Sequence, residues 1–195
     1  MSYFPAFLRF DNKKVLLIGG GAVAYEKLLH LVDFTKSISV IALDICQDTK
    51  RLIESNDLTY HNRAYKKGDI AGYDIVVVAV NDISLQIDIY IESRGHRCLC
   101  NFVDLPQNCD FTFGSYIKRD DLVIAISTSG ASPALAKGLK LYLQDFIPSS
   151  ITKFLEEMRH LRETLPKGKE RMELLSQKAK EYINNLKNHN PEHNK

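Results

Sequence analysis

The sequence predicts an α/β protein that has a parallel sheet, then a β-hairpin, then a small helical C-terminal domain. Segments typical of strands and of helices alternate through the first half of the chain, which is the pattern of a parallel α/β sheet. A glycine-rich turn joins the first of these strands to the first helix. From Ser132 onward nearly all of the chain has a helical composition. We therefore expect a Rossmann-like domain followed by two further regions.

In the first half we expect five strands separated by helical or polar segments. The strands are residues 13–18, 37–43, 57–61, 73–80 and 97–103. Helices are expected at 22–34 and 84–95, although the alternation of Ile with polar residues in the second also permits a strand. The strand at 73–80 is apolar enough to be covered on both faces. A polar segment that contains Ile45 and Leu52 has no assigned element.

The character of the chain changes after Asp110. Residues 111–128 predict an antiparallel hairpin with a charged turn at 118–121. Ser132 is placed to cap a helix and Pro133 to occupy its first position, so a helix is expected over 132–148. Two more helices are expected at 149–166 and 169–186, before a tail that looks frayed.

These elements suggest three domains: a Rossmann-like domain at residues 1–112, a dimerisation region at 113–148 and a helical domain at 149–195. A hairpin exposes its edges unless something pairs with them. A second copy of the chain is the natural partner, so we expect a homodimer.

Composition limits the classes of function. The chain has 195 residues, 45% of them hydrophobic, which allows one sizeable core and a smaller appendage. The net charge of +2 gives no argument for nucleic-acid binding. No apolar run reaches the roughly 18 residues of a membrane span, and the N-terminus lacks the features of a secretory signal. We expect a cytoplasmic protein that binds neither nucleic acid nor membrane.

The glycine-rich turn is the first candidate site. Gly19, Gly21 and Ala24 match the pattern G-x-G-x-x-A, in which the glycines allow a tight turn and a close approach to a pyrophosphate. The helix that follows offers backbone N–H groups to the phosphates. Asp44, near the end of the second strand, would bind the ribose hydroxyls and repel a 2′-phosphate, which favours NAD over NADP. The alternative is a glycine-rich turn with no ligand.

A second candidate site follows the strand at 97–103. Ligands of doubly wound sheets bind beyond the carboxyl ends of the strands, and Asn101, Asp104 and Asp110 lie where a substrate beside a nicotinamide would meet the protein. Taken alone, Asp104 is also a good turn-forming residue ahead of Pro106. Asn81 and Asp82, after the preceding strand, are equally suited to cap a helix.

The cysteines predict core packing rather than a metal site. Cys98 and Cys100 alternate in an expected strand and therefore share one face, and free cysteine is commonly buried. Cys109 lies near the second candidate site, and its role is open. His30, His61, His96 and His160 show no ligand spacing. His189 and His193 lie four residues apart in the tail that looks frayed and could bind metal on a helix, but we assign no metal site.

Three stretches together identify a family. They are "YFPAFLRFDNKKVLLIGGGAVAYEK", "NFVDLPQNCDFTF" and "LVIAISTSGASPALAK". The chain resembles, over most of its length, the precorrin-2 dehydrogenases of siroheme synthesis, some of which are also sirohydrochlorin ferrochelatases. It is similar to the N-terminal part of siroheme synthases, without their methyltransferase domain.

The resemblance implies a function and a set of residues. It implies NAD as cofactor, oxidation of the tetrapyrrole precorrin-2 to sirohydrochlorin, and Fe(II) as a co-substrate where iron is inserted. The family's NAD contacts fall on Ala22 and Val23 and on Leu43 and Asp44. Its catalytic aspartate is Asp104, and a carboxylate base suits the loss of a hydride and a proton.

The stretch "STSGASP" is the third candidate site. Ser127, Thr128 and Ser129 lead into a helix start and could hold substrate carboxylates. Capping and close dimer packing explain the same residues equally well. Lys118 and Arg119 in the hairpin turn are further candidates, although a solvated turn explains both.

The chain departs from the family pattern at two places. Leu105 stands where relatives often have an acid, and Gly114 where they often have proline. Fewer acids near the site weaken the case for iron binding. The alternatives to a dehydrogenase are a chelatase alone, for iron or cobalt, and a non-catalytic NAD-sensing regulatory module.

Overall fold

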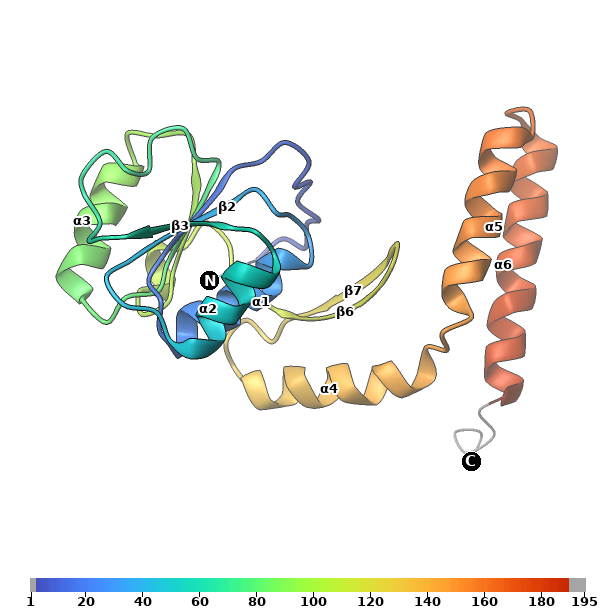
Figure 1. Cartoon of the computed structure of the whole chain (residues 1–195). Coiled ribbons are helices and arrows are strands. Elements are labelled where there is room, and N and C mark those ends of the chain that lie inside the picture. The colour runs from blue at the N-terminus through green and yellow to red at the C-terminus, as the bar shows by residue number, and fades with distance from the viewer. Residues whose placement is uncertain (1–2, 190–195) are drawn as a thin grey trace. The chain divides into compact units, whose positions relative to one another are not determined.

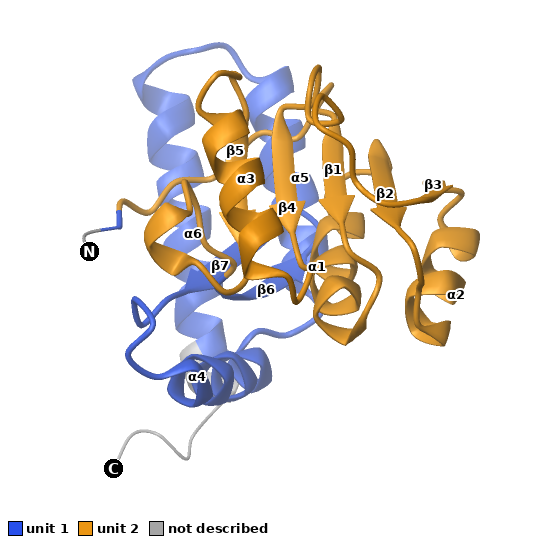
Figure 2. Ribbon diagram, turned by 90° about the vertical axis from the view of Figure 1, so that its left-hand side faces the viewer, with its two compact units in different colours: residues 1–3, 114–195 blue, residues 4–113 orange. Residues whose placement is uncertain are grey.

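The computed structural model describes residues 3–189, which fall into two compact units. Unit 2 is Phe4–Phe113, and unit 1 comprises the chain from Gly114 together with the N-terminal end (Figure 2). The three-domain division expected from the sequence stays a prediction.

Unit 2 is built on a parallel sheet of five strands. In chain order they are β1 (Val15–Ile18), β2 (Ile38–Ala42), β3 (Thr59–Asn62), β4 (Ile75–Val78) and β5 (Leu99–Phe102). They lie in the order β3-β2-β1-β4-β5, and every neighbouring pair is parallel (Figure 2). This doubly wound arrangement confirms the predicted Rossmann-like fold.

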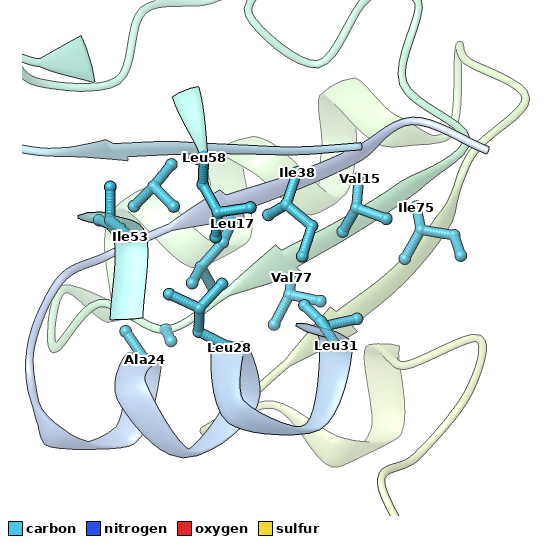
Figure 3. Close-up of a cluster of buried hydrophobic side chains, with 12 residues drawn as sticks. Val15, Leu17, Ala24, Leu28, Leu31, Ile38, Ile53, Leu58, Ile75 and Val77 are labelled. Atoms are coloured by element: carbon cyan, nitrogen blue, oxygen red, sulfur yellow. The ribbon is translucent and has the colours of Figure 1, made fainter. Parts of the chain in front are cut away.

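Helices cover both faces of this sheet. Helices α1 (Ala22–Val32) and α2 (Gln47–Ser55) contribute to one buried cluster, and α3 (Ile83–Ser93) contributes to the other. Figure 3 shows the first cluster, in which Ala24, Leu28 and Leu31 of α1 face the sheet. Successive residues of β1 and β4 alternate between the two clusters, so both central strands are fully buried.

The structure adds one helix that the sequence did not predict and decides between two alternatives for another segment. Residues 47–55 form α2, to which the sequence analysis assigned no element. Only Thr49 and Ile53 of this helix are buried, so its sequence is mostly polar and shows no apolar helical period. The segment at 84–95 is a helix, so the strand alternative is wrong. Asp82 caps α3 by accepting a hydrogen bond from the backbone N–H of Leu85 at 3.0 Å, which fixes the first helical turn.

Unit 1 contains the hairpin and three helices. The hairpin is antiparallel, from β6 (Ser115–Arg119) to β7 (Leu122–Ile126), and Asp120 in its turn has a φ of 51°. Ser132 caps α4 (Pro133–Phe146) by accepting from the N–H of Leu135 at 3.2 Å. Both elements are where the sequence predicts them.

The last two helices of unit 1 pack as a pair, α5 (Ile151–Thr164) beside α6 (Lys169–His189) (Figure 1). The rings of Phe154 and Tyr182 stack at 4.2 Å, and Lys178 forms an ion pair with Glu157 at 2.6 Å. Helix α6 continues past the predicted end at residue 186, and residues 190–195 of the expected frayed tail lie outside the described residues. Within residues 3–189, no helix is long and apolar enough to span a bilayer.

Candidate active site

The glycine turn between β1 and α1 is tightly packed at two positions and open at the third. Gly19 has a φ of +123°, and a Cβ there would lie 2.1 Å from the carbonyl oxygen of Ala79. A Cβ on Gly20 would lie 2.3 Å from the carbonyl oxygen of Asp44. A Cβ on Gly21 would meet no atom of the described chain within 4 Å. Gly21 is therefore the position at which a ligand can approach the backbone.

Helix α1 begins at this turn without a side-chain cap. Its N-cap residue is Gly21, and within the described residues no side chain bonds to the N–H groups of the first turn. Helices α3 and α4 are capped by Asp82 and Ser132, whereas α2 and α5, like α1, have no side-chain cap. An uncapped helix N-terminus beside an open glycine is suited to bind an anion.

The other predicted glycine-motif residues agree with this geometry. Ala24 is fully buried between α1 and the sheet, where a larger side chain would push the helix away. Ala22 is exposed and Val23 is 45% exposed, so both lie at the surface of the helix start.

The loop after β2 is joined to the glycine turn. The backbone N–H of Cys46 donates to the carbonyl oxygen of Gly20 at 2.8 Å. Leu43 is 63% exposed and Asp44 is exposed, directly after β2. Because β1 and β2 are parallel neighbours, both loops leave the same edge of the sheet.

The turn, the uncapped helix and this acid together fit a dinucleotide. The bound contacts of Leu43 and Asp44 stay predictions.

Gly20 is a residue that the motif did not single out. The pattern G-x-G leaves its middle position free, yet Gly20 is buried against the loop of Asp44 and Ile45. The signal was present in the sequence as three consecutive glycines.

Asp104 follows β5 at the same edge of the sheet and is exposed. Its carboxylate oxygen Oδ2 accepts a hydrogen bond from Nε2 of Gln86 at 2.7 Å. Gln86 is fully buried in the first turn of α3, and the same nitrogen donates to the carbonyl oxygen of Val80 at 2.7 Å. Sequence reasoning missed Gln86 because nothing in a helical pattern marks a buried glutamine.

The loop that begins at Asp104 is fixed at its far end by Asp110. The Asp110 carboxylate pairs with Arg94, with an N–O distance of 2.9 Å, and accepts from the backbone N–H of Cys100 at 2.8 Å. The hydrogen bonds from Arg94 hold the pKa of Asp110 below its ordinary value. The structure therefore gives Asp110 a role in holding the loop.

Asn101 and Cys109 stabilise the same loop from inside. Asn101 is 6% exposed, and its Nδ2 donates to the carbonyl oxygen of Phe111 at 2.9 Å. The thiol of Cys109 lies 3.2 Å from both the backbone nitrogen and the carbonyl oxygen of Phe102, and burial raises its pKa. Contact between Asn101 and a substrate stays a prediction.

Cys98, directly before β5, and Cys100, within it, are both buried in the same core cluster, with their sulfur atoms 3.7 Å apart. This confirms that they share a face directed to the core. Among the side chains of residues 3–186, no group of three or more His, Cys, Asp or Glu is arranged to hold a metal ion.

The Ser127–Ser129 stretch belongs to unit 1 and is held by its own hydroxyls. The N–H of Ser129 donates to Oγ of Ser127, and the N–H of Ser132 donates to Oγ1 of Thr128, each at 3.1 Å. Ser129 has a φ of 52°. In the hairpin, Lys118 is exposed and Arg119 donates to the carbonyl oxygen of Gln144 at 3.2 Å. Binding of substrate carboxylates by any of these residues stays a prediction.

Known proteins share this architecture and sequence pattern. The siroheme synthase of Pseudoalteromonas atlantica is 32% identical over 165 residues, which is 85% of this chain and 36% of that protein. The siroheme synthase of Methylococcus capsulatus is 30% identical over 175 residues, 88% of this chain and 37% of that protein. The chain thus spans about a third of the length of these curated relatives.

A solved structure has the same fold. The structure of "SirC, precorrin-2 dehydrogenase" superposes with a TM-score of 0.76 at 24% identity, and the match covers 95% of this chain and all of that one. A family model described as "Putative NAD(P)-binding" matches residues 6–115, more than half of the chain. That match includes the glycine turn, the loop after β2 and Asp104. The sequence similarity to siroheme synthases and the shared fold of the precorrin-2 dehydrogenase agree with the resemblance that the motifs indicate. The chain therefore belongs to this NAD(P)-binding family.

Proposed function

We propose that this protein oxidises precorrin-2 to sirohydrochlorin with NAD as the hydride acceptor. The observation that carries the proposal is the exposed Asp104 carboxylate, which is fixed by a buried amide at the sheet edge where the uncapped glycine turn also lies. The names of the similar proteins, siroheme synthase and precorrin-2 dehydrogenase, indicate the substrate class.

The glycine turn and the loop after β2 would hold the cofactor. Backbone N–H groups at Gly21, Ala22 and Val23 would bind the pyrophosphate; the absence of a side-chain cap at this helix start supports this. Asp44 would accept hydrogen bonds from ribose hydroxyls, and its charge would oppose a 2′-phosphate. When bound, NAD supplies the two-electron oxidant for this reaction.

Asp104 would take the proton. Dehydrogenation removes two hydrogens from the macrocycle, one as a hydride and one as a proton, so a base is required beside the reacting carbon. Asp104 is exposed and oriented by Gln86, which fits that task. Asn101, Ser127, Thr128 and Ser129 remain candidates for contacts with the substrate carboxylates.

The test is anaerobic conversion of precorrin-2, followed by absorbance, with and without NAD. We expect turnover that requires NAD in the wild type and falls at least about a hundredfold in Asp104→Ala, the usual range for loss of a general base. Asp88→Asn changes another exposed aspartate, on α3, and is the matched control that should retain activity.

Each contrary outcome has a distinct meaning. Full turnover by Asp104→Ala would reject this residue as the base while keeping the enzyme. Absence of turnover by a wild type that binds NAD would favour the regulatory module.

Iron insertion is the second activity that the proposal includes. Metallation expels protons from the pyrrole nitrogens, so the same Asp104 carboxylate could accept them. The macrocycle itself would hold Fe(II), since no metal cage is found among the described residues. Adding Fe(II) or Co(II) after sirohydrochlorin has formed tests this, and metallation by a protein that does not oxidise precorrin-2 with NAD would favour a chelatase alone.

A further inference from the structure

Gln86 is the one fully buried amide side chain beside the candidate site in the described chain. It lies in the first turn of α3, four residues after the capping residue Asp82. Burying an amide is costly unless its polar atoms find partners. Its Nε2 donates to the carbonyl oxygen of Val80 and to Oδ2 of Asp104, each at 2.7 Å.

The two acceptors fix the orientation of this amide. An amide nitrogen has two hydrogens, and here each has its own acceptor. A flipped side chain would place Oε1 against the Val80 carbonyl and the Asp104 carboxylate, two repulsive contacts. In the observed orientation Oε1 lies 3.4 Å from the backbone nitrogen of Asp104, which donates to it. Gln86 thus contacts both the backbone and the carboxylate of Asp104.

This arrangement makes the two carboxylate oxygens of Asp104 different. Oδ2 is held by Gln86. Oδ1 makes no hydrogen bond with any side chain or backbone group of residues 3–186, and Asp104 is exposed. A carboxylate held by one oxygen keeps a fixed direction for the other.

We propose that Gln86 is the positioning residue for Asp104, and that Oδ1 is the oxygen that takes up the substrate proton. The proposal rests on the dehydrogenase function proposed above and names an element of that site which the motifs do not contain. Gln86 does not touch the reacting atoms. It acts by holding the base in a productive direction, and small misplacements of catalytic groups are costly to rate.

The test replaces the amide by an apolar side chain of similar length, Gln86→Met, in the wild type and in Asp104→Ala. In the wild-type background we expect kcat to fall by roughly 10- to 100-fold. KM for precorrin-2 and the Kd for NAD should stay within about twofold, because neither ligand contacts a fully buried residue. In the Asp104→Ala background the same substitution should change kcat by less than about twofold.

Ile89→Ala is the matched control for lost stability. Ile89 is fully buried in the same helix and belongs to the core cluster, so its truncation lowers the melting temperature without touching Asp104. This variant should keep kcat at a temperature where it is folded. The amide proton resonances of Gln86 give a readout independent of turnover, because one of the two should shift in Asp104→Ala.

The outcomes separate the inference from the function. An unchanged kcat in Gln86→Met, an equal loss in both backgrounds, or an equal loss in Ile89→Ala would each overturn the positioning role while leaving the dehydrogenase intact. A wild type that binds NAD but does not turn over precorrin-2 would reject the proposed function, and the positioning role with it.

Discussion

At the residue scale, the three adjacent glycines have different reasons to be glycine. Gly19 needs a left-handed backbone, with its φ of +123°. Gly20 has no room for a side chain, because a Cβ would meet both the backbone of Asp44 and the side chain of Ile45. Gly21 is surrounded by open space. A motif written in letters does not distinguish these causes, but substitution by alanine does.

We therefore expect Gly20→Ala to lower mainly the stability of the fold and Gly21→Ala to weaken mainly the binding of NAD. Gly20→Ala should destabilise the fold by about 2–3 kcal/mol or more, because the added methyl group overpacks a site closed by backbone. Gly21→Ala should cost about 1 kcal/mol or less, since it changes only an N-cap residue. It should nevertheless weaken NAD binding at least about tenfold, because the methyl group blocks the approach to the backbone.

Thermal denaturation and titration calorimetry with NAD measure the two effects. A Gly21→Ala protein that binds NAD as tightly as the wild type would contradict the assignment of this turn to the pyrophosphate. A Gly20→Ala protein of unchanged stability would show that the loop of Asp44 can move aside.

At the element scale, α3 determines where the loop after β5 lies. Gln86 in its first turn holds Asp104, and Arg94 at its C-terminal end holds Asp110. The sequence predicted this helix and the loop separately. It could not predict their connection, because a hydrogen bond between residues 86 and 104 leaves no periodic pattern in the chain.

The Arg94–Asp110 pair should make stability depend on pH in the acid range. Arg94 lowers the pKa of Asp110 in the folded protein. The pair's contribution is therefore complete above the unfolded pKa of about 3.9 and is lost as pH falls through the lower folded value. Since the Arg94 side chain is 42% exposed, we expect a contribution of only about 1 kcal/mol after screening.

Urea denaturation of the wild type and of Arg94→Met at pH 6 and near pH 2 measures this contribution. The wild type should be more stable by about 1 kcal/mol at pH 6, and the difference should shrink at the acid end. A difference that stays constant across this range would mean that Arg94 stabilises the protein through packing alone.

At the scale of the whole molecule, the hairpin of unit 1 leaves its outer edges without a partner strand in the described chain. Isolated two-stranded hairpins are marginally stable. Helix α4 carries large apolar side chains at the surface on one face, with Leu135 55% exposed and Leu139 39% exposed. The predicted homodimer would cover such a surface.

Light scattering after size-exclusion chromatography tests the dimer directly. We expect a mass about twice the 22.2 kDa of one chain. The double variant Leu135→Glu/Leu139→Glu should elute as a monomer with unchanged circular dichroism, because both side chains are exposed and one turn apart. A wild type of single-chain mass at micromolar concentration would reject the homodimer.

Most of the fold could be predicted because its signals are local. The apolar runs of β1 and β4, the Ser132-Pro133 helix start and the charged hairpin turn each lie within a few neighbouring residues. Helix α2 was not predicted, since it buries too few apolar residues to show a helical period. Within the candidate site, the glycine turn could be located, whereas the roles of Gly20 and Gln86 depend on contacts with distant residues.

The two contacts made by α3 have a consequence for how this chain can vary. Gln86 and Arg94 are eight positions apart, which corresponds to about 12 Å along a helix. Deleting or inserting one residue between them would turn one partner by about 100° relative to the other, and Asp104 and Asp110 could no longer both be engaged. The spacing between these two positions is therefore constrained by two separate contacts to the same loop. Substitution of an exposed position between them, such as Asp88, preserves this spacing, whereas a change in the number of residues does not.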